Sequence, residues 1–326
     1  MNKPPFEITN QILSSTISIT EKIGKVDSYR LLKKMPILRR NNKIKSIHSS
    51  LVIENNSLSL DQVMDVIAGK LVIGPQKEIQ EVKNAYEAYN LIEDFDCYLE
   101  NDLLKAHGIL SRLLVDDPGR YRNHPEGVFD GKNVIFVAPP ENMVPSLMSN
   151  LFEWLKNDTE TPLLIKSCVF HYEFVFIHPF SDGNGRTARL WQNVILTQWN
   201  PEFEYIPIET YIQKYQSTYY ETIDKCHKSG NSTKFIEFML KMIDETLTDV
   251  LVTINKEKMS ISNAINKLLD VMEYDIPYSA NELMNRLEIK SKETLRGTYL
   301  NPAIENGLVK MTLPDKPNSK NQQYYK

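Results

Sequence analysis

Apolar residues recur at helical spacing along most of this chain, and this pattern restricts its fold more than any other feature. Ile8, Ile12, Ile19 and Ile23 fit one face of a first helix. Glycine, which weakens helices, contributes only 12 of the 326 residues. We therefore predict a mainly α fold. Further helical patterns cover about 77–96, 100–115, 142–156, 161–176, 184–199, 209–228 and 233–255.

Between the first helix and residue 77 the chain shows two further patterns. A basic stretch runs over 30–45 with Leu31, Leu32, Ile37 and Leu38 interspersed, and a solvated helical face is favoured there over a site for an acidic partner. Next, Ser59 and Gln62 have the spacing of a capping box, and an apolar stripe follows them. We expect a short helix that starts after Ser59 and stops near Gly69.

The overall composition is that of a globular protein with two or three domains, since 41% of residues are hydrophobic and 25% are charged. A net charge of −4 argues against a protein that coats nucleic acid along its whole length. Cys97, Cys168 and Cys226 form neither a metal-ligand spacing nor a disulfide framework, which favours a reducing compartment. The N-terminal residues lack the apolar core of a signal peptide, and no apolar run reaches membrane-spanning length. We expect a cytoplasmic protein with no membrane partner.

One segment departs from the helical pattern. In GVFDGKNVIFVAPP, two β-prone runs flank Asp130 and Gly131, a dipeptide suited to a tight turn, and Pro139 and Pro140 end the segment. We predict a β-hairpin here.

The stretch HPFSDGNGRTAR, residues 178–189, concentrates groups that bind and transfer phosphates. The turn over 183–185 contains two glycines, and successive N–H groups in such a turn can bind an anion. A helical pattern follows, so the positive end of a helix dipole points the same way. Arg186 and Arg189 are three apart, share a helix face and match phosphate oxygens.

Two more groups in this stretch suggest a reaction. Asp182 is a hard carboxylate beside the turn, as a Mg²⁺ ligand near phosphates would be. His178 titrates near neutral pH and can take a proton from a hydroxyl. Each residue alone also has an ordinary structural interpretation. Together, in this order, they indicate phosphoryl or nucleotidyl transfer.

The same stretch resembles the Fic family, because it matches the motif HPFx[DE]GNGRxxR at every defined position. The resemblance implies a helical-bundle domain that transfers AMP from ATP to a Tyr, Thr or Ser hydroxyl of a target protein. It implies that His178 is the base, that Asp182 holds Mg²⁺, and that Gly183, Asn184 and Gly185 contact the phosphates.

The two arginines also receive roles from the resemblance: Arg186 binds phosphates and Arg189 holds the γ-phosphate. Other family members transfer phosphate or phosphocholine, and the GNGR form found here favours AMP.

A second motif resembles an inhibitory element of the same family. Ser50, Glu54 and Asn55 match [ST]xxxE[GN], and residues 50 and 54 would share a helix face. In the family this glutamate pairs with the last arginine of the active-site motif, here Arg189. An arginine held by a carboxylate cannot also orient a γ-phosphate. We therefore expect an autoinhibited enzyme.

The resemblance extends to the hairpin and to a pair of tyrosines. The family has a flap that pairs with the target segment, and Val134, Ile135 and Phe136 suit such strand addition, although a small structural hairpin is the alternative. Tyr219 and Tyr220 resemble a pair that lines the adenine pocket.

Two histidines outside the motif differ in what we expect of them. His227 stands where related proteins often carry asparagine, which puts the adenine contacts in doubt. We interpret His171 as a packing residue.

The C-terminal segment resembles a winged helix. From residue 276 onward it has eight Lys or Arg and five Asp or Glu, a net charge of 8 − 5 = +3. Lys290, Lys292 and Arg296, around a helix that would begin near Ser291, could contact DNA phosphates, although such folds also bind proteins.

The expected organisation has three parts. An N-terminal helical region with the inhibitory helix spans 1–110, a Fic catalytic domain with its hairpin flap spans 111–255, and a winged-helix-like domain spans 256–326. ATP is the expected substrate and Mg²⁺ the cofactor. Two other functions stay open: removal of AMP from a modified protein, with Glu54 positioning water, and a DNA-binding regulator that senses nucleotide. A homodimer also stays open.

Overall fold

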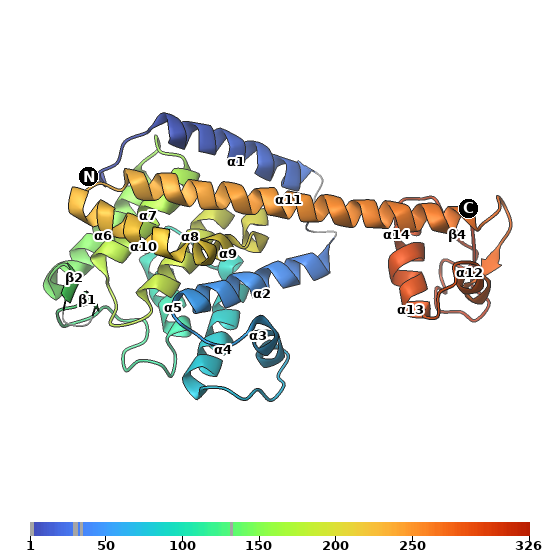
Figure 1. Ribbon diagram of the computed structural model, residues 1–326, viewed down its shortest axis with the longest axis horizontal. Helices are drawn as coiled ribbons and strands as arrows, with labels where there is room; N and C mark the ends of the chain where they lie inside the picture. The colour runs from blue at the N-terminus through green and yellow to red at the C-terminus, as the bar shows by residue number, and fades with distance from the viewer. Residues whose placement is uncertain (1–2, 29–31, 33–34, 131–132) are drawn as a thin grey trace. The chain divides into compact units, whose positions relative to one another are not determined.

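The computed structural model describes residues 3–28, 32, 35–130 and 133–326. The chain divides into two compact units, Met1–Val250 and Leu251–Lys326. Most described residues lie in helices, so the predicted mainly α class is confirmed (Figure 1). Within the described parts of the chain, none of the helices combines the length and apolar character that a membrane crossing needs.

The first unit is built from helices and one hairpin. Its α-helices are α1 (Asn10–Ser28), α2 (Pro36–Ile53), α3 (Leu60–Ile67), α4 (Gln76–Asn90), α5 (Glu100–Leu110), α6 (Val144–Asn157), α7 (Leu163–Ile177), α8 (Asn184–Trp199), α9 (Ile208–Lys214), α10 (Gln216–Ser229) and the start of α11 (Thr233–Asp270). Short 3₁₀ turns are η2 (Ile92–Asp94), η3 (Glu141–Met143) and η4 (Pro201–Tyr205).

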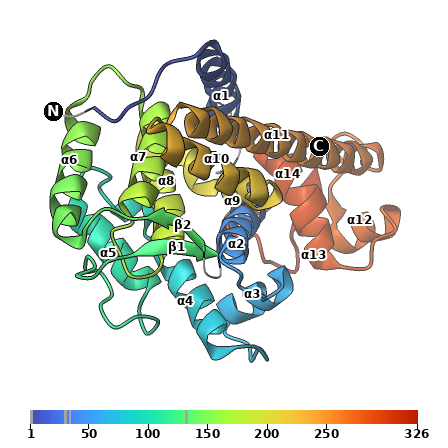
Figure 2. The same cartoon turned by 60° about the vertical axis from the view of Figure 1, so that its left-hand side comes forward.

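Helix α8 lies inside this unit and packs against α7, α5 and α2 (Figure 2). Nearly all of its side chains are buried, including Trp191, and Phe170 and Phe174 of α7 are fully buried beside it. Burying a large apolar side chain contributes about 1.5–3 kcal/mol. The α7–α8 pair is therefore a rigid support for the loop that joins the two helices.

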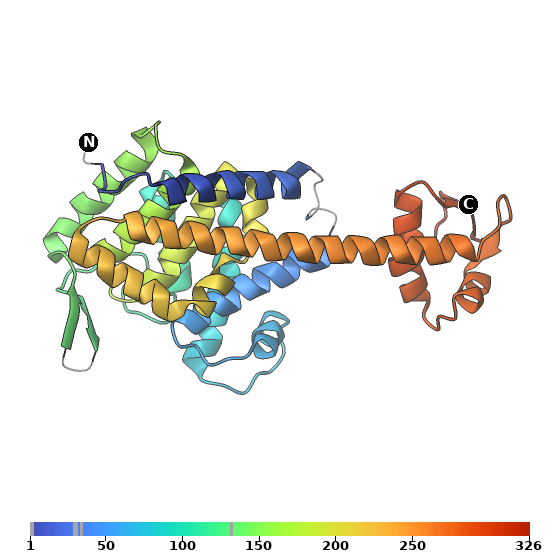
Figure 3. The same ribbon diagram turned by 45° about the horizontal axis from the view of Figure 1, so that its top comes forward.

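Helix α1 lies along α11, as Figures 1 and 3 both show. Ile12 and Ile19 are fully buried, and the Ser18 hydroxyl donates a hydrogen bond to Asp244 at 2.7 Å. The predicted stripe began too early, because Ile8 precedes the helix and is 48% exposed. The Thr9 hydroxyl accepts a hydrogen bond from the Ile12 N–H, which favours a helix start after Thr9.

The capping box predicted for α3 is confirmed. The Ser59 hydroxyl accepts from the Gln62 N–H at 3.3 Å, and the Gln62 side chain accepts from the Ser59 N–H at 2.9 Å. In the basic stretch, Ile37 is 75% exposed whereas Leu32 and Leu38 are buried, and Leu31 lies outside the described residues.

Two helical segments differ from their predicted bounds. The segment 209–228 is two helices, because the chain bends at Tyr215 between α9 and α10. Helix α11 continues to Asp270 rather than ending near 255, since no glycine or proline interrupts 233–270. The boundary expected at 255–256 therefore falls inside a helix.

The predicted hairpin is present as β1 (Gly127–Asp130) and β2 (Asn133–Val137), two antiparallel strands that extend from the helical body (Figure 3). Val128 pairs with Phe136, and the register shifts at a bulge next to Val128. Gly131, expected in the turn, lies outside the described residues.

The second unit has its own core. It contains α12 (Ala280–Arg286), α13 (Lys292–Thr294), a π-helical turn η5 (Leu295–Leu300), α14 (Asn301–Glu305), and the strands β3 (Tyr278–Ser279), β4 (Lys310–Met311) and β5 (Gln323–Tyr325). The three strands form an antiparallel sheet in the order β3-β5-β4. Leu268, Leu283 and Tyr324 are among its buried residues.

The helix expected near Ser291 begins at Lys292, with the Ser291 hydroxyl accepting from the Thr294 N–H. Lys290, Lys292 and Arg296 are exposed. The winged-helix assignment and a DNA partner remain predictions.

Candidate active site

Residues 178–183 join α7 to α8 through two left-handed backbone positions. His178 ends α7 with φ 50°, and its N–H donates to the Phe174 carbonyl at 3.0 Å. Gly183 precedes α8 with φ +79°, a conformation that disfavours any side chain. These two reversals place the histidine and the start of α8 in one short loop.

The side chain of Asn184 closes this loop. Its oxygen accepts from the Phe180 N–H at 2.9 Å, and its nitrogen donates to the Phe180 carbonyl at 2.7 Å. Asn184 is only 4% exposed. We expected it to contact phosphates, and the geometry gives its amide a second task, which is to hold the loop in shape.

His107 packs against this loop and holds it by hydrogen bonds, and no sequence pattern indicates this role. Its ring stacks on Phe180 with centroids 3.6 Å apart. Its Nδ1 accepts from the Gly119 N–H at 2.9 Å, so Nε2 carries the proton and donates to the Asp182 carbonyl at 3.0 Å. Burial lowers the pKa of His107 to about 4, so it stays neutral and keeps this hydrogen-bond pattern.

Arg122 is a second residue that sequence reasoning missed. Its guanidinium donates to the carbonyls of His178 at 2.8 Å and His124 at 2.9 Å, and also to that of Pro139. Its own N–H donates to the Pro179 carbonyl at 2.9 Å. Arg122 therefore ties both ends of the β1–β2 hairpin to the loop that carries His178.

The surroundings of His178 favour the neutral form of its imidazole. Burial lowers its pKa, and the Val175 carbonyl and Glu126 offset only part of this effect. The ring is therefore neutral at neutral pH and has a nitrogen free to accept a proton.

Arg189 is held by Ser50 of α2 and by Glu54, the C-cap of the same helix, four residues later. Its Nε donates to the Ser50 hydroxyl at 3.0 Å, and its Nη2 donates to the Ser50 carbonyl at 2.9 Å and to Glu54 Oε1 at 2.8 Å. Arg189 is 2% exposed. Burial alone would lower its pKa, but the Glu54 carboxylate, together with Tyr219 and Tyr220, outweighs burial and the pKa is raised. The sequence-based pairing of these side chains is thus present in the structure.

The Glu54 carboxylate lies directly over the first turn of α8. A Cβ placed on Gly185 would lie 2.2 Å from Glu54 Oε1 and 3.1 Å from Arg189 Nη1. That Nη1 is buried and has no hydrogen-bond partner among the described residues. The N-terminus of α8, the absence of a side chain at Gly185 and the unsatisfied Nη1 of Arg189 form a cradle that suits a phosphate, and Glu54 occupies one side of it.

Helix α2 ends at Ile53 with Glu54 as its C-cap, and the next residue, Asn55, takes a left-handed conformation with φ 65°. Helix α10 holds this end in place. The Ile53 carbonyl accepts from Gln216 Nε2 at 2.9 Å and from the Tyr220 hydroxyl at 3.3 Å. Tyr220, expected near the adenine, therefore also contacts the last residue of α2.

Tyr219 is buried, and its hydroxyl contacts His171 Nε2 at 2.9 Å. The other ring nitrogen of His171 contacts Gln192 at 2.6 Å. The packing role predicted for His171 is confirmed.

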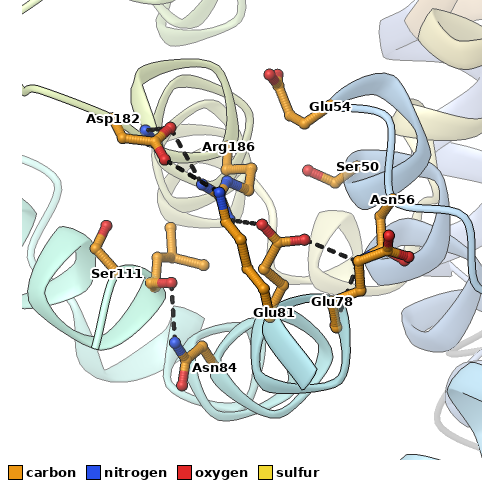
Figure 4. A network of polar contacts seen from close by, with 12 residues as sticks. Ser50, Glu54, Asn56, Glu78, Glu81, Asn84, Ser111, Asp182 and Arg186 are labelled. Carbon is orange, nitrogen blue, oxygen red and sulfur yellow. Dashed lines mark hydrogen bonds and ion pairs between the residues drawn. The ribbon is translucent and has the colours of Figure 1, made fainter. Parts of the chain in front are cut away.

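Arg186, although on the same helix as Arg189, points to different partners (Figure 4). Its Nη1 lies 3.2 Å from Glu81 of α4, and its Nη2 lies 3.4 Å from Asp182. Arg186 is 5% exposed, so a solvated helix face is excluded. Glu81 was not foreseen, because nothing in the sequence places α4 beside this loop.

The fit to Mg²⁺ rests on one carboxylate. Among the residues that the structure describes, no group of three or more His, Cys, Asp or Glu side chains could hold a metal ion. The Asp182 side chain is 47% exposed beside the cradle. Mg²⁺ commonly binds through one or two carboxylates together with substrate phosphates, and Asp182 fits that use.

At the hairpin, the ring of Phe136 stacks on His227 with centroids 4.2 Å apart. Burial lowers the pKa of His227 to about 4, so it too is neutral. The strand that carries Val134 and Ile135 is present, but their side chains lie outside those described.

Comparisons with known proteins show which family this chain resembles in sequence and fold. Residues 95–196 match the model of the Fic/DOC family, and residues 263–325 match the model described as "Filamentation induced by cAMP protein Fic-like, C-terminal domain". The structure is similar to that of a Fic family protein from Desulfovibrio desulfuricans G20, with 42% identity and a TM-score of 0.75 over 99% of this chain and 98% of the other.

Curated relatives are more distant. The chain is 24% identical to "Protein adenylyltransferase fic-1" of Caenorhabditis elegans over 82% of this chain and 52% of that protein. It is 30% identical to a probable protein adenylyltransferase of Aquifex aeolicus over 46% of each. The chain thus spans about half the length of the curated relatives it matches.

Proposed function

Because this chain belongs to the Fic/DOC family, we propose that it transfers AMP from ATP to a hydroxyl of a target protein, under the control of Glu54. One observation carries the proposal. The cradle at the start of α8 combines phosphate-binding groups with a neutral histidine nearby, and the carboxylate of Glu54 occupies part of it.

In this proposal the triphosphate of ATP lies at the N-terminus of α8. Arg189 has an unsatisfied Nη1, and the buried Nε of Arg186 also lacks a hydrogen bond among the described residues. These donors match phosphate oxygens. Asp182 would hold Mg²⁺, which when bound neutralises charge on the phosphates.

His178 then takes the proton of the target hydroxyl. The hydroxyl oxygen forms a bond to the α-phosphorus while the bond from that phosphorus to the bridging oxygen breaks, and pyrophosphate leaves with the electron pair. The hairpin β1–β2 holds the target segment by strand addition. Arg122 links this hairpin to the loop of His178, so docking and base are positioned together.

Glu54 opposes this reaction because it competes with the terminal phosphate for Arg189 and for the space over Gly185. A carboxylate and a phosphate cannot both fill a site where a single Cβ would already be in contact. ATP then binds in a position that is unsuited to transfer.

The test uses ATP labelled at either the α- or the γ-phosphorus, a cell lysate as the source of targets, and the Glu54→Gly variant. We expect protein labelling from the α-label only, and none with the added His178→Ala change. Labelling from the γ-label would instead indicate phosphate transfer and would contradict the proposal.

Removal of AMP is a second candidate at the same site. Only Oε1 of Glu54 contacts Arg189, and the side chain is 35% exposed, so its other oxygen can orient a water molecule. Loss of AMP from a modified target, dependent on Glu54, would support removal. Unchanged loss with Glu54→Gly would exclude it.

A further inference from the structure

Glu81 of α4 joins two parts of the site that the Glu54–Arg189 pair does not connect (Figure 4). Its Oε1 lies 3.2 Å from Arg186 Nη1, and its Oε2 accepts a hydrogen bond from Asn56 Nδ2 at 2.8 Å. All three residues are nearly buried, with exposures of 9% for Glu81, 5% for Arg186 and 5% for Asn56. One carboxylate therefore serves a phosphate-binding arginine and the turn after α2.

Asn56 fixes the turn that carries Glu54. Its N–H donates to the Leu51 carbonyl at 3.1 Å, and its side-chain oxygen accepts from the Leu58 N–H at 3.1 Å. Its Nδ2 also donates to the Glu78 carbonyl at 3.2 Å. Since Glu54 lies two residues earlier, the position of its carboxylate depends on these contacts.

Electrostatics couple the two contacts of Glu81, one with Arg186 and one with Asn56. A buried carboxylate must keep its cation or its hydrogen bonds, because an uncompensated buried charge is strongly destabilising. When phosphates bind Arg186, the Glu81 carboxylate loses part of its compensation and is repelled by the negative phosphates, so it moves away from Arg186 and also from Asn56. Coupling between two sites is reciprocal, so a turn held by Glu81 also disfavours the phosphate-bound state of Arg186.

We propose that Glu81 is a positioning residue that couples Arg186 to the inhibitory turn. With Arg186 free of phosphate, Glu81 and Asn56 hold Glu54 against Arg189. Phosphate binding at Arg186 releases this hold and weakens the inhibition. The inference rests on the proposed function, since it concerns the regulation of the same site.

The chain provides a matched control on the same helix. Glu78 Oε2 accepts from the N–H and the hydroxyl of Ser57, both at 2.7 Å. Glu78 thus anchors the same turn but, within the described residues, has no contact with Arg186. If only the anchoring of the turn at residues 56–57 matters, Glu78→Gln and Glu81→Gln have equal effects on AMP transfer. If the link to Arg186 matters, only Glu81→Gln has a large one.

The experiment measures AMP transfer from α-labelled ATP for Glu81→Gln, Asn56→Ala and Glu78→Gln, each alone and together with Glu54→Gly. We expect Glu81→Gln and Asn56→Ala to raise transfer by at least about fivefold, the lower end of typical coupling. Glu78→Gln should change transfer by less than about fivefold, which is below the typical range of coupling. In the Glu54→Gly background none of the three should raise transfer further.

A second readout is ATP affinity, measured by calorimetry in the His178→Ala background, where no turnover occurs. Glu54→Gly should tighten ATP binding when Glu81 is intact, and should tighten it less when Glu81 is replaced by Gln. Thermal unfolding checks that each variant folds, and Asn56→Ala breaks the same link if Glu81→Gln does not fold.

The outcomes separate the two proposals. Equal effects of Glu78→Gln and Glu81→Gln, or effects that persist without Glu54, would overturn the coupling while AMP transfer stands. Absence of transfer in every variant would overturn the proposed function, and the affinity cycle would still decide the coupling. Absence of ATP binding would overturn both.

Discussion

Replacing Glu54 by glycine tests the inhibition directly. The change removes the hydrogen bond from Arg189 Nη2 to Glu54 Oε1, and Ser50 still binds Nε and Nη2. Arg189 therefore keeps its place while its outer side becomes available to phosphate. Glu54→Gln keeps the shape of the side chain and removes only its charge, so it separates the effect of the charge from that of the occupied space.

The expected rise in kcat/KM on Glu54→Gly follows from the hydrogen bond that Arg189 loses. A hydrogen bond to a charged group contributes about 1.5–3 kcal/mol. The Glu54 side chain is 35% exposed, and exposure weakens ion pairs, so the lower part of that range applies. With 1.36 kcal/mol for each factor of ten, about 1.5–2 kcal/mol corresponds to a rise in kcat/KM of roughly 10- to 30-fold. Glu54→Gln should give a smaller rise.

The assay is the initial rate of AMP incorporation at ATP concentrations below KM, with His178→Ala as the inactive reference. Thermal unfolding confirms that the variants are folded. If Glu54→Gly folds normally and transfers AMP no faster than the parent, while His178→Ala abolishes transfer, then Glu54 does not inhibit and our interpretation of its position is wrong.

Further expectations concern pH, metal and loop structure. Burial lowers the pKa of His178 below about 6.5, the ordinary value for histidine. AMP transfer should therefore rise with pH only below about 6.5 and stay constant above it. A rate that still rises near pH 8 would contradict this. Burial also lowers the pKa of His107 to about 4 and of His171 to about 3, so below pH 6.5 the unfolded chain binds protons that the folded chain does not. The free energy of unfolding, from urea titrations, should then fall by up to about 1.4 kcal/mol per pH unit for each group, and stability unchanged down to pH 4 would refute it. Removing Mg²⁺ with a chelator should abolish AMP transfer, and full activity in the chelator would exclude the metal. Asn184→Ala should lower the free energy of unfolding by about 1–3 kcal/mol, because it leaves the Phe180 N–H without its partner, and an unchanged urea midpoint would contradict this role.

Local patterns were sufficient to predict part of this protein. Helical periodicity gave the class, and the spacing of Ser59 and Gln62 gave a capping box that the structure contains. The spacing of Ser50 and Glu54 placed both side chains on one face of α2, because a helix repeats every 3.6 residues. Such features depend on residues close together in the chain, so the sequence alone can show them.

Other features came only from the packing of distant segments. Arg186 and Arg189 look alike in sequence, yet one faces Glu81 of α4 and the other faces Glu54 of α2. His107 and Arg122 carry no motif, and they act on the loop only because their elements pack beside it. The sequence by itself determined which groups are present and which share a helix face. The tertiary structure decided which charges meet, because each of these contacts joins residues far apart in the chain, whose meeting depends on how whole helices pack.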